Sequence, residues 1–325
     1  MIKIDDVSDE KWGTVNPLNK KLVEEFLEQS TTLSDQTLKQ YKSALRIYYY
    51  WVKDNAGDKP FYELKSRDFL FYQNWLTKLE QSSASIRFKR SAVSSLNNYI
   101  SLYYGEEYKD FRNYITKGIP LPAISFVNEK KPVNMKEYKN LCSALEKEER
   151  WQLLAYLKFS FSTGARRSEV RQLLKEVSTY EPKVIDNNGE KINVYATHKI
   201  RCKGRGKIGK VRQLNFDQDA MDAIKKWLEI RGEDDCPFVF VVKENGKYVN
   251  VSESTFNAWA ENHFNRIVGR RINPHSLREA RVTTMVVEQG KDISSAQKLL
   301  GHNSSSTTQI YLIREDEDEA DDAFV

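Results

Sequence analysis

Cysteine is scarce in this sequence of 325 residues, and long apolar runs are missing from it. The three cysteines, Cys142, Cys202 and Cys236, are odd in number and widely spaced, which excludes a disulfide framework and a CxxC zinc site. No stretch approaches the ~18 uninterrupted apolar residues of a membrane-spanning helix. The first residues also lack the basic and apolar regions of a secretory signal. We therefore expect a cytoplasmic protein with no membrane partner.

A phosphate-binding GxxxxGK[ST] loop is also missing, which argues against the use of ATP. What is present fits a folded globular protein of about two domains. Hydrophobic residues make up 40% of the chain and charged residues 30%, and 6 Trp, 17 Tyr and 15 Phe supply ample core material. This composition excludes wholesale disorder.

Charge is unevenly distributed along the chain. The sequence carries 51 Lys and Arg against 46 Asp and Glu, a net charge of +5. Residues 315–325 contain seven of the acids and no base, so residues 1–314 hold 51 bases and 39 acids and carry +12. A basic body with an acidic end favours a polyanionic partner. The alternative is a solvated surface with a tail that aids solubility.

Residues 17–104 carry the pattern of four amphipathic helices. Apolar side chains recur at three- and four-residue steps in Pro17–Leu27 and in three further segments that begin at or near Ser34, Ser66 and Ser83. Four such helices predict a compact bundle.

The remainder of the chain is predicted to be mostly helical, with a few short strands. Lys117–Pro132 contains three prolines and little periodicity, which indicates an extended linker. Helical patterning resumes at Asn134, whereas Lys191–Phe216 reads as short strands joined by a glycine-rich turn, and Phe238–Val241 as another short strand. The predicted organisation is a helical domain, a linker, a mostly helical second domain with a small β-hairpin or sheet, and an acidic tail, over residues 1–116, 117–132, 133–314 and 315–325.

The predicted hairpin is the strongest local basic signal. Seven bases and no acid lie within fourteen residues there. Such a segment can follow a phosphate backbone, where each neutralised phosphate releases counterions, whereas the alternative is a solvated strand edge that lysines protect from aggregation. The seven bases are Lys199, Arg201, Lys203, Arg205, Lys207, Lys210 and Arg212.

Three separated motifs bring together residue types suited to phosphate chemistry. The first, TGARRSEV, places Arg166 at a turn between two helices; the second, PHSLR, places His275 and Arg278 on one helix face. The third, LLGH, ends at His302, and Tyr311 follows nine residues later. Arginine forks and imidazole donors suit a phosphorane transition state, in which negative charge increases on the non-bridging oxygens.

Taken together and in this order, the motifs closely resemble those of the tyrosine recombinases, the family that includes phage integrases. The resemblance covers about residues 15–312. It implies an N-terminal helical core-binding (SAM-like) domain, a catalytic domain with the DNA breaking-rejoining fold, and strand transfer without metal, ATP or another cofactor. The catalytic residues that it implies are Arg166, Lys203, His275, Arg278, His302 and Tyr311.

The resemblance also implies a role for each of these residues. Tyr311 would form a 3′-phosphotyrosine, and Arg166, Arg278 and His302 would bind the scissile phosphate. His275 would act as acid and base toward the tyrosine, and Lys203 would protonate the leaving 5′ oxygen. Glu169 would orient this network from behind. The residues predicted to contact DNA are Arg87, Lys89, Arg90, Arg201, Arg205 and Lys207.

Some assignments have alternatives. Arg167 adjoins Arg166, and only the register of the box selects Arg166; Lys199 or Lys207 can replace Lys203 as the general acid. Glu279 stands where a histidine often follows the second arginine of this family, which puts one neighbouring contact in doubt.

We expect a site-specific recombinase, an integrase of a phage or other mobile element, that acts on double-stranded DNA as a homotetramer and takes no small-molecule substrate. The alternatives are a recombinase of the chromosome-dimer-resolution type, a topoisomerase IB-like nicking and closing enzyme, and a DNA-bending protein with a decayed site. Phe324 and Val325, at the end of the acidic tail, are expected either to dock on a neighbouring protomer or to remain in solvent.

Overall fold

The structure is a computed structural model that describes residues 4–123, 131–187, 189–202 and 209–301. The described residues form two compact units, one up to residue 123 and the other from residue 131 onward. Each unit has its own hydrophobic core. In this part of the chain, no helix combines the length and the apolar character needed to cross a membrane.

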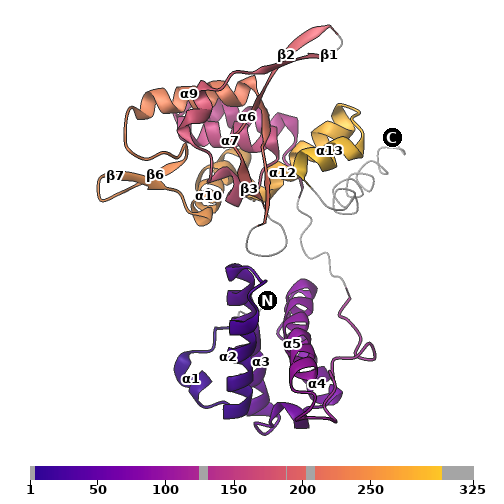
Figure 1. Ribbon diagram of the computed structural model, residues 1–325. Helices are drawn as coiled ribbons and strands as arrows, with labels where there is room; N and C mark the ends of the chain where they lie inside the picture. Colours follow the sequence, from indigo (N-terminus) through magenta and orange to yellow (C-terminus); the bar gives the residue numbers. More distant parts are fainter. Residues whose placement is uncertain (1–3, 124–130, 188, 203–208, 302–325) are drawn as a thin grey trace. The chain divides into compact units, whose positions relative to one another are not determined.

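The N-terminal unit is a helical bundle, as predicted. Its long helices pack α3 against α2, α4 and α5, with fully buried Leu45, Tyr48 and Val52 of α3 in the core (Figure 1). Serine caps start two of them, because the side chains of Ser34 and Ser82 accept hydrogen bonds from the third backbone N–H that follows each. The helices are α2 (Pro17–Gln29), α3 (Asp35–Asn55), α4 (Ser66–Lys78) and α5 (Ser83–Tyr103).

A short helix near the start of the chain was not predicted. Helix α1 (Asp9–Gly13) is capped by Ser8, and its Trp12 is buried in the bundle core. The segment contains one large apolar residue, too few to produce a helical stripe. A 3₁₀ turn, η1 (Phe61–Glu63), is likewise held by the burial of Phe61.

Side chains of α4 and α5 bind the backbone of the segment that follows α5. Arg90 donates to the carbonyls of Thr116 and Ile119, and Arg87 donates to that of Pro122. Gln73 of α4 donates to the carbonyl of Pro120 at 2.8 Å. The first residues of the predicted linker therefore lie against the bundle.

The C-terminal unit is built around helix α7 (Trp151–Thr163). Almost all of its side chains are buried, and it packs against α6 (Met135–Lys147), α9 (Gln218–Arg231) and α12 (Pro274–Thr283) (Figure 1). A helix that is apolar on all sides belongs inside a core. The short elements α8 (Arg167–Val170) and the 3₁₀ turn η2 (Lys175–Thr179) follow it.

Three small antiparallel sheets complete this unit. Strands β1 (Lys183–Asn187), β2 (Glu190–Ala196) and β5 (Asn215–Asp217) pair in that order, and β3 (Ile200–Cys202) pairs with β4 (Lys210–Arg212). The glycine-rich segment thus contains the predicted short strands. The third sheet is the hairpin of β6 (Val241–Glu244) and β7 (Lys247–Asn250).

The strand predicted over Phe238–Val241 is displaced in the structure. Strand β6 begins at Val241. Val239 and Phe240 before it are buried in the core, whereas Phe238 is half-buried and forms a single bridge to Leu174. A short apolar run does not distinguish a strand from a buried loop.

The last helices of the described chain carry the second and third motifs. Helix α12 continues into a π-helical turn, η4 (Thr284–Glu288), and α13 (Ile293–Leu300) ends at Gly301. Between β7 and α12 lie α10 (Glu253–Trp259), the π-helical turn η3 (Ala260–Phe264) and α11 (Asn265–Val268).

Candidate active site

The first arginine motif lies in the turn between α7 and α8. Gly164 ends α7 in the left-handed conformation, with φ of +58°, and a Cβ on it would lie 2.5 Å from a methyl of Leu300. Glycine is therefore required both by the backbone and by the approach of α13. Arg166 then caps α8.

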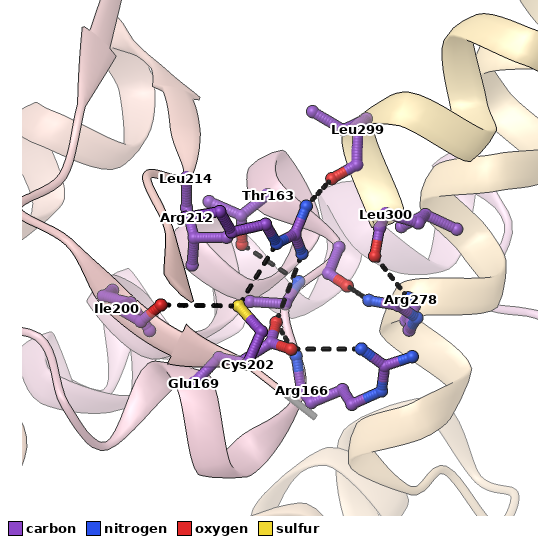
Figure 2. A network of polar contacts seen from close by, with 12 residues as sticks. Thr163, Arg166, Glu169, Ile200, Cys202, Arg212, Leu214, Arg278, Leu299 and Leu300 are labelled. Carbon is purple, nitrogen blue, oxygen red and sulfur yellow. Dashed lines mark hydrogen bonds and ion pairs between the residues drawn. The ribbon is translucent and has the colours of Figure 1, made fainter. Parts of the chain in front are cut away.

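The carboxylate of Glu169 binds both the backbone and the side chain of Arg166. Its carboxylate accepts from the Arg166 backbone N–H and from the guanidinium Nη1, each at 3.1 Å. Glu169 is fully buried, whereas 29% of the Arg166 side chain is exposed. This arrangement holds one side of the guanidinium and leaves part of it open to a ligand (Figure 2). Arg167 donates instead to Asn257 of α10, so it lies apart from this cluster.

Arg278 is the buried arginine of the cluster. It lies in α12, which Asn273 caps, and only 1% of the residue is exposed. Its guanidinium donates to the carbonyl of Gly164 and, at 2.9 Å, to that of Leu300. The end of α7, the face of α12 and the end of α13 therefore meet at one guanidinium (Figure 2).

His275 lies in the first turn of α12, with half of its side chain exposed. Its Nε2 lies 3.6 Å from a carboxylate oxygen of Glu279, one turn along the helix. Glu279, the residue that departs from the family pattern, is buried and lies beside His275.

Arg212 is a member of the cluster that the sequence did not single out. Its three guanidinium nitrogens donate to three different groups: Nε to the thiol of Cys202 at 3.2 Å, Nη1 to the carbonyl of Leu299, and Nη2 to the carboxylate of Glu169 at 3.4 Å. In the sequence it is the last of seven bases, and nothing local distinguishes it from the other six. Its contact with α13 is a feature of the tertiary structure alone.

The β3–β4 hairpin is also fixed to the segment after α8. The side-chain amide of Gln172 both donates to the carbonyl of Arg201 and accepts from its N–H, at 2.9 and 3.0 Å. Burial raises the pKa of the Cys202 thiol, which keeps it neutral beside Arg212. Lys203, Arg205 and Lys207, like His302 and Tyr311, lie outside the described residues.

The three bases predicted on α5 lie on one helix. Arg87 and Arg90 donate to the carbonyls described above, and Lys89 donates to the hydroxyl of Ser85 at 2.9 Å. Burial lowers the pKa of Arg90, with a smaller contribution from the charge of Arg87. Within the described ranges, no three His, Cys, Asp or Glu side chains gather as metal ligands would.

Solved structures similar in fold to this chain include a site-specific recombinase and a transposon integrase. The fold matches XerH site-specific recombinase bound to a palindromic difH substrate with a TM-score of 0.64, over 99% of this chain and 91% of that one at 18% identity. It matches the Tn1549 transposon integrase in complex with transposon right-end DNA with a TM-score of 0.65, over 90% and 93% of the two chains at 16% identity. The chain therefore shares the fold of these two recombinase structures.

Sequence relatives specify the family. Residues 131–318 match the model of the phage integrase family. The chain is 32% identical over its whole length to the SPbeta prophage-derived recombinase-like protein YomM of Bacillus subtilis, and 30% identical to tyrosine recombinase XerA of Pyrococcus furiosus. The match covers 96% of the first relative and 90% of the second. The protein belongs to the phage integrase family of tyrosine recombinases, enzymes that exchange DNA strands, which confirms the resemblance found in the motifs.

Proposed function

We propose that the protein is a site-specific recombinase that cuts and rejoins double-stranded DNA through a 3′-phosphotyrosine, without metal or ATP. The observation that carries the proposal is that Arg278, distant in sequence, binds the carbonyl of Gly164, two residues before Arg166. Arg166 is partly exposed, which suits direct contact of its guanidinium with the phosphate. Arg278 is buried, which suits a guanidinium that holds the surrounding backbone in place.

The proposed chemistry is an exchange of esters at phosphorus. The phenol oxygen of Tyr311 attacks the scissile phosphate while its proton passes to His275. The bond to the 5′ oxygen breaks, and that oxygen takes a proton from Lys203. Arg166, with Arg278 and His302 in support, stabilises the charge on the non-bridging oxygens. Attack by a 5′ hydroxyl reverses these steps, so the bond energy is conserved.

The experiment begins with duplexes that the full-length protein selects from a randomised pool. A set of duplexes is then made from the selected sequence, each with a nick at a different position in one strand. Cleavage close to the nick releases a short fragment, so religation is not possible and the enzyme remains attached to the DNA. We expect an adduct that survives SDS with the wild type and with Tyr180→Phe, a matched control that removes only a hydroxyl bound to the exposed Glu176, and none with Tyr311→Phe. An adduct that persists in Tyr311→Phe would assign the nucleophile elsewhere.

The proposed role is the integration and excision of a mobile element, because the prophage-derived relative matches the whole chain. Resolution of chromosome dimers is the second candidate, because Xer proteins are also among the relatives. Two selected sites placed on one plasmid, or on two, separate these roles by the products formed. Relaxation of a supercoiled plasmid that lacks the selected site would instead indicate a topoisomerase-like activity.

A further inference from the structure

The C-terminal end of α13 is bound by two arginines. Arg212 donates to the carbonyl of Leu299, and Arg278 donates to that of Leu300. The last carbonyls of a helix lack partners within the helix and carry partial negative charge, so cations at this end are stabilising. The two guanidiniums therefore fix the last turn of α13, from which the chain continues through Gly301 to His302.

Arg212 connects this helix end to two other parts of the site. It lies in β4, opposite Ile200 of β3, at the base of the hairpin that continues into Lys203. It also shares Glu169 with Arg166. The shared carboxylate is fully buried, and both guanidiniums pair with it.

Gly301 shows how closely the guanidinium approaches the helix end. A Cβ on Gly301 would lie 3.0 Å from both Cζ and Nη1 of Arg212, and its φ is +63°. Glycine thus serves two purposes in the LLGH motif: it permits the left-handed cap, and it leaves space for the guanidinium.

We propose that Arg212 is a positioning residue of the strand-transfer reaction. It joins the β3–β4 hairpin, the carboxylate that orients Arg166 and the end of α13, so that the strand before Lys203, the start of α8 and the helix before His302 keep a fixed relation. All three of its nitrogens face protein groups. Arg212 therefore acts through its neighbours, and this inference rests on the proposed function.

The test separates DNA affinity from the cleavage rate, measured with the full-length protein on the nicked selected duplex. For Arg212→Gln we expect affinity within about twofold of the wild type and single-turnover cleavage at saturating DNA reduced roughly 10–100-fold, since small displacements in an active site have effects of this size. Arg212→Lys should recover only part of the rate. Lysine keeps the positive charge, but one ammonium cannot bind both the carbonyl of Leu299 and the carboxylate of Glu169. Arg266→Gln, which removes an exposed ion pair with Glu148, is the matched control and should cleave normally.

A second pair of variants leaves the charge in place. Gly301→Ala pushes the guanidinium aside, whereas Gly290→Ala adds a methyl at a similar φ of +59° with nothing within 4 Å. With Arg212 present, we expect Gly301→Ala to reduce the cleavage rate roughly tenfold more than Gly290→Ala does. In the Arg212→Gln variant, the two alanine substitutions should reduce the cleavage rate equally.

Three outcomes are distinguishable. Equal cleavage by wild type and Arg212→Gln, or equal effects of the two alanines, would overturn the positioning role while the recombinase proposal stands. No adduct from the wild type on any selected duplex would overturn the proposed function itself. If Arg212→Gln melts before the assay temperature, the two glycine variants decide the question.

Discussion

At the scale of single residues, the site is organised around one buried carboxylate. Glu169 accepts from Arg166 and Arg212, and its position also fixes the start of α8. Glu169 was predicted because the resemblance to the tyrosine recombinases implies that role for it. Its second partner, Arg212, is distant in sequence and gives no sequence signal.

Replacing Glu169 by Gln should affect both stability and chemistry. The amide keeps the shape but removes the charge between two guanidiniums, and we expect a loss of about 2 kcal/mol, or roughly 4–8 °C in melting temperature. Single-turnover cleavage should fall by at least about tenfold, because Arg166 loses its orientation. Thermal melting and the nicked-duplex assay measure the two effects.

Glu229→Gln is the matched control for this prediction, because Glu229 is exposed and paired with Lys226 on the surface of α9. A surface pair contributes about 0–1 kcal/mol, so this variant should melt and cleave like the wild type. An unchanged melting temperature in Glu169→Gln would mean that the carboxylate does not hold the two arginines together.

At the scale of elements, the start of the C-terminal unit is held by an ion pair. Arg270, in the loop between α11 and α12, binds both oxygens of Glu137 in the first turn of α6, at 2.7 and 2.6 Å. The same guanidinium donates to the carbonyls of Lys131 and Pro132. The chain is therefore fixed to α6 at the point where this unit begins.

This ion pair predicts a specific loss of stability in acid. The hydrogen bonds from Arg270 lower the pKa of Glu137 below its ordinary value of 4.5. A lowered pKa in the folded state stabilises the protein above about pH 4.5, and this contribution disappears as the pH falls through the folded-state value. Urea unfolding should show Glu137→Gln less stable than the wild type at pH 7, with a difference that shrinks as the pH falls below about 4.5.

Lys226→Gln provides the control for the acid experiment, because it alters a surface pair of α9 and should leave the pH profile unchanged. A constant difference between wild type and Glu137→Gln from pH 7 to pH 3 would show that the carboxylate stabilises the fold by packing and not by its charge.

Elements with strong periodicity were predicted well, and those formed by tertiary contacts were not. Helices α2 to α5 follow directly from their apolar stripes, and α3 and α5 also from their serine caps, whereas the cap expected at Ser66 is wrong because α4 begins after Lys65. Helix α1 depends on one tryptophan, and β6 starts only where the buried run ends at Val241. The same contrast holds in the site: Arg166, His275 and Arg278 belong to local motifs, whereas the partners of Arg212 come from three separate segments.

At the scale of the whole molecule, the distribution of charge leads to a prediction about assembly. Residues 315–325 are acidic and lie outside the described residues, whereas the rest of the chain is basic. We propose that the protein acts as a homotetramer on DNA, and that this tail, with Phe324 and Val325 at its end, docks on a neighbouring protomer.

Ending the chain at Arg314 should then reduce cooperative assembly on a selected duplex and slow recombination, while the adduct formed by Tyr311 on a nicked duplex persists. Gel-shift titration and mass measurement of the complexes follow assembly directly. The double variant Phe324→Ala and Val325→Ala separates docking from charge. Unchanged cooperativity and recombination after the truncation would contradict the docking of the tail.

The glycine ends of α7 and α13 have a consequence for how this sequence tolerates change. The side chain of Leu300 packs against the backbone of Gly164, and the guanidinium of Arg212 packs against that of Gly301. Both contacts join distant segments and depend on the absence of a Cβ. Random mutagenesis should recover few substitutions at either glycine alone. A larger residue at Gly164 needs a smaller one at Leu300 for space and still carries the strain of a positive φ, so even that paired change should be recovered rarely.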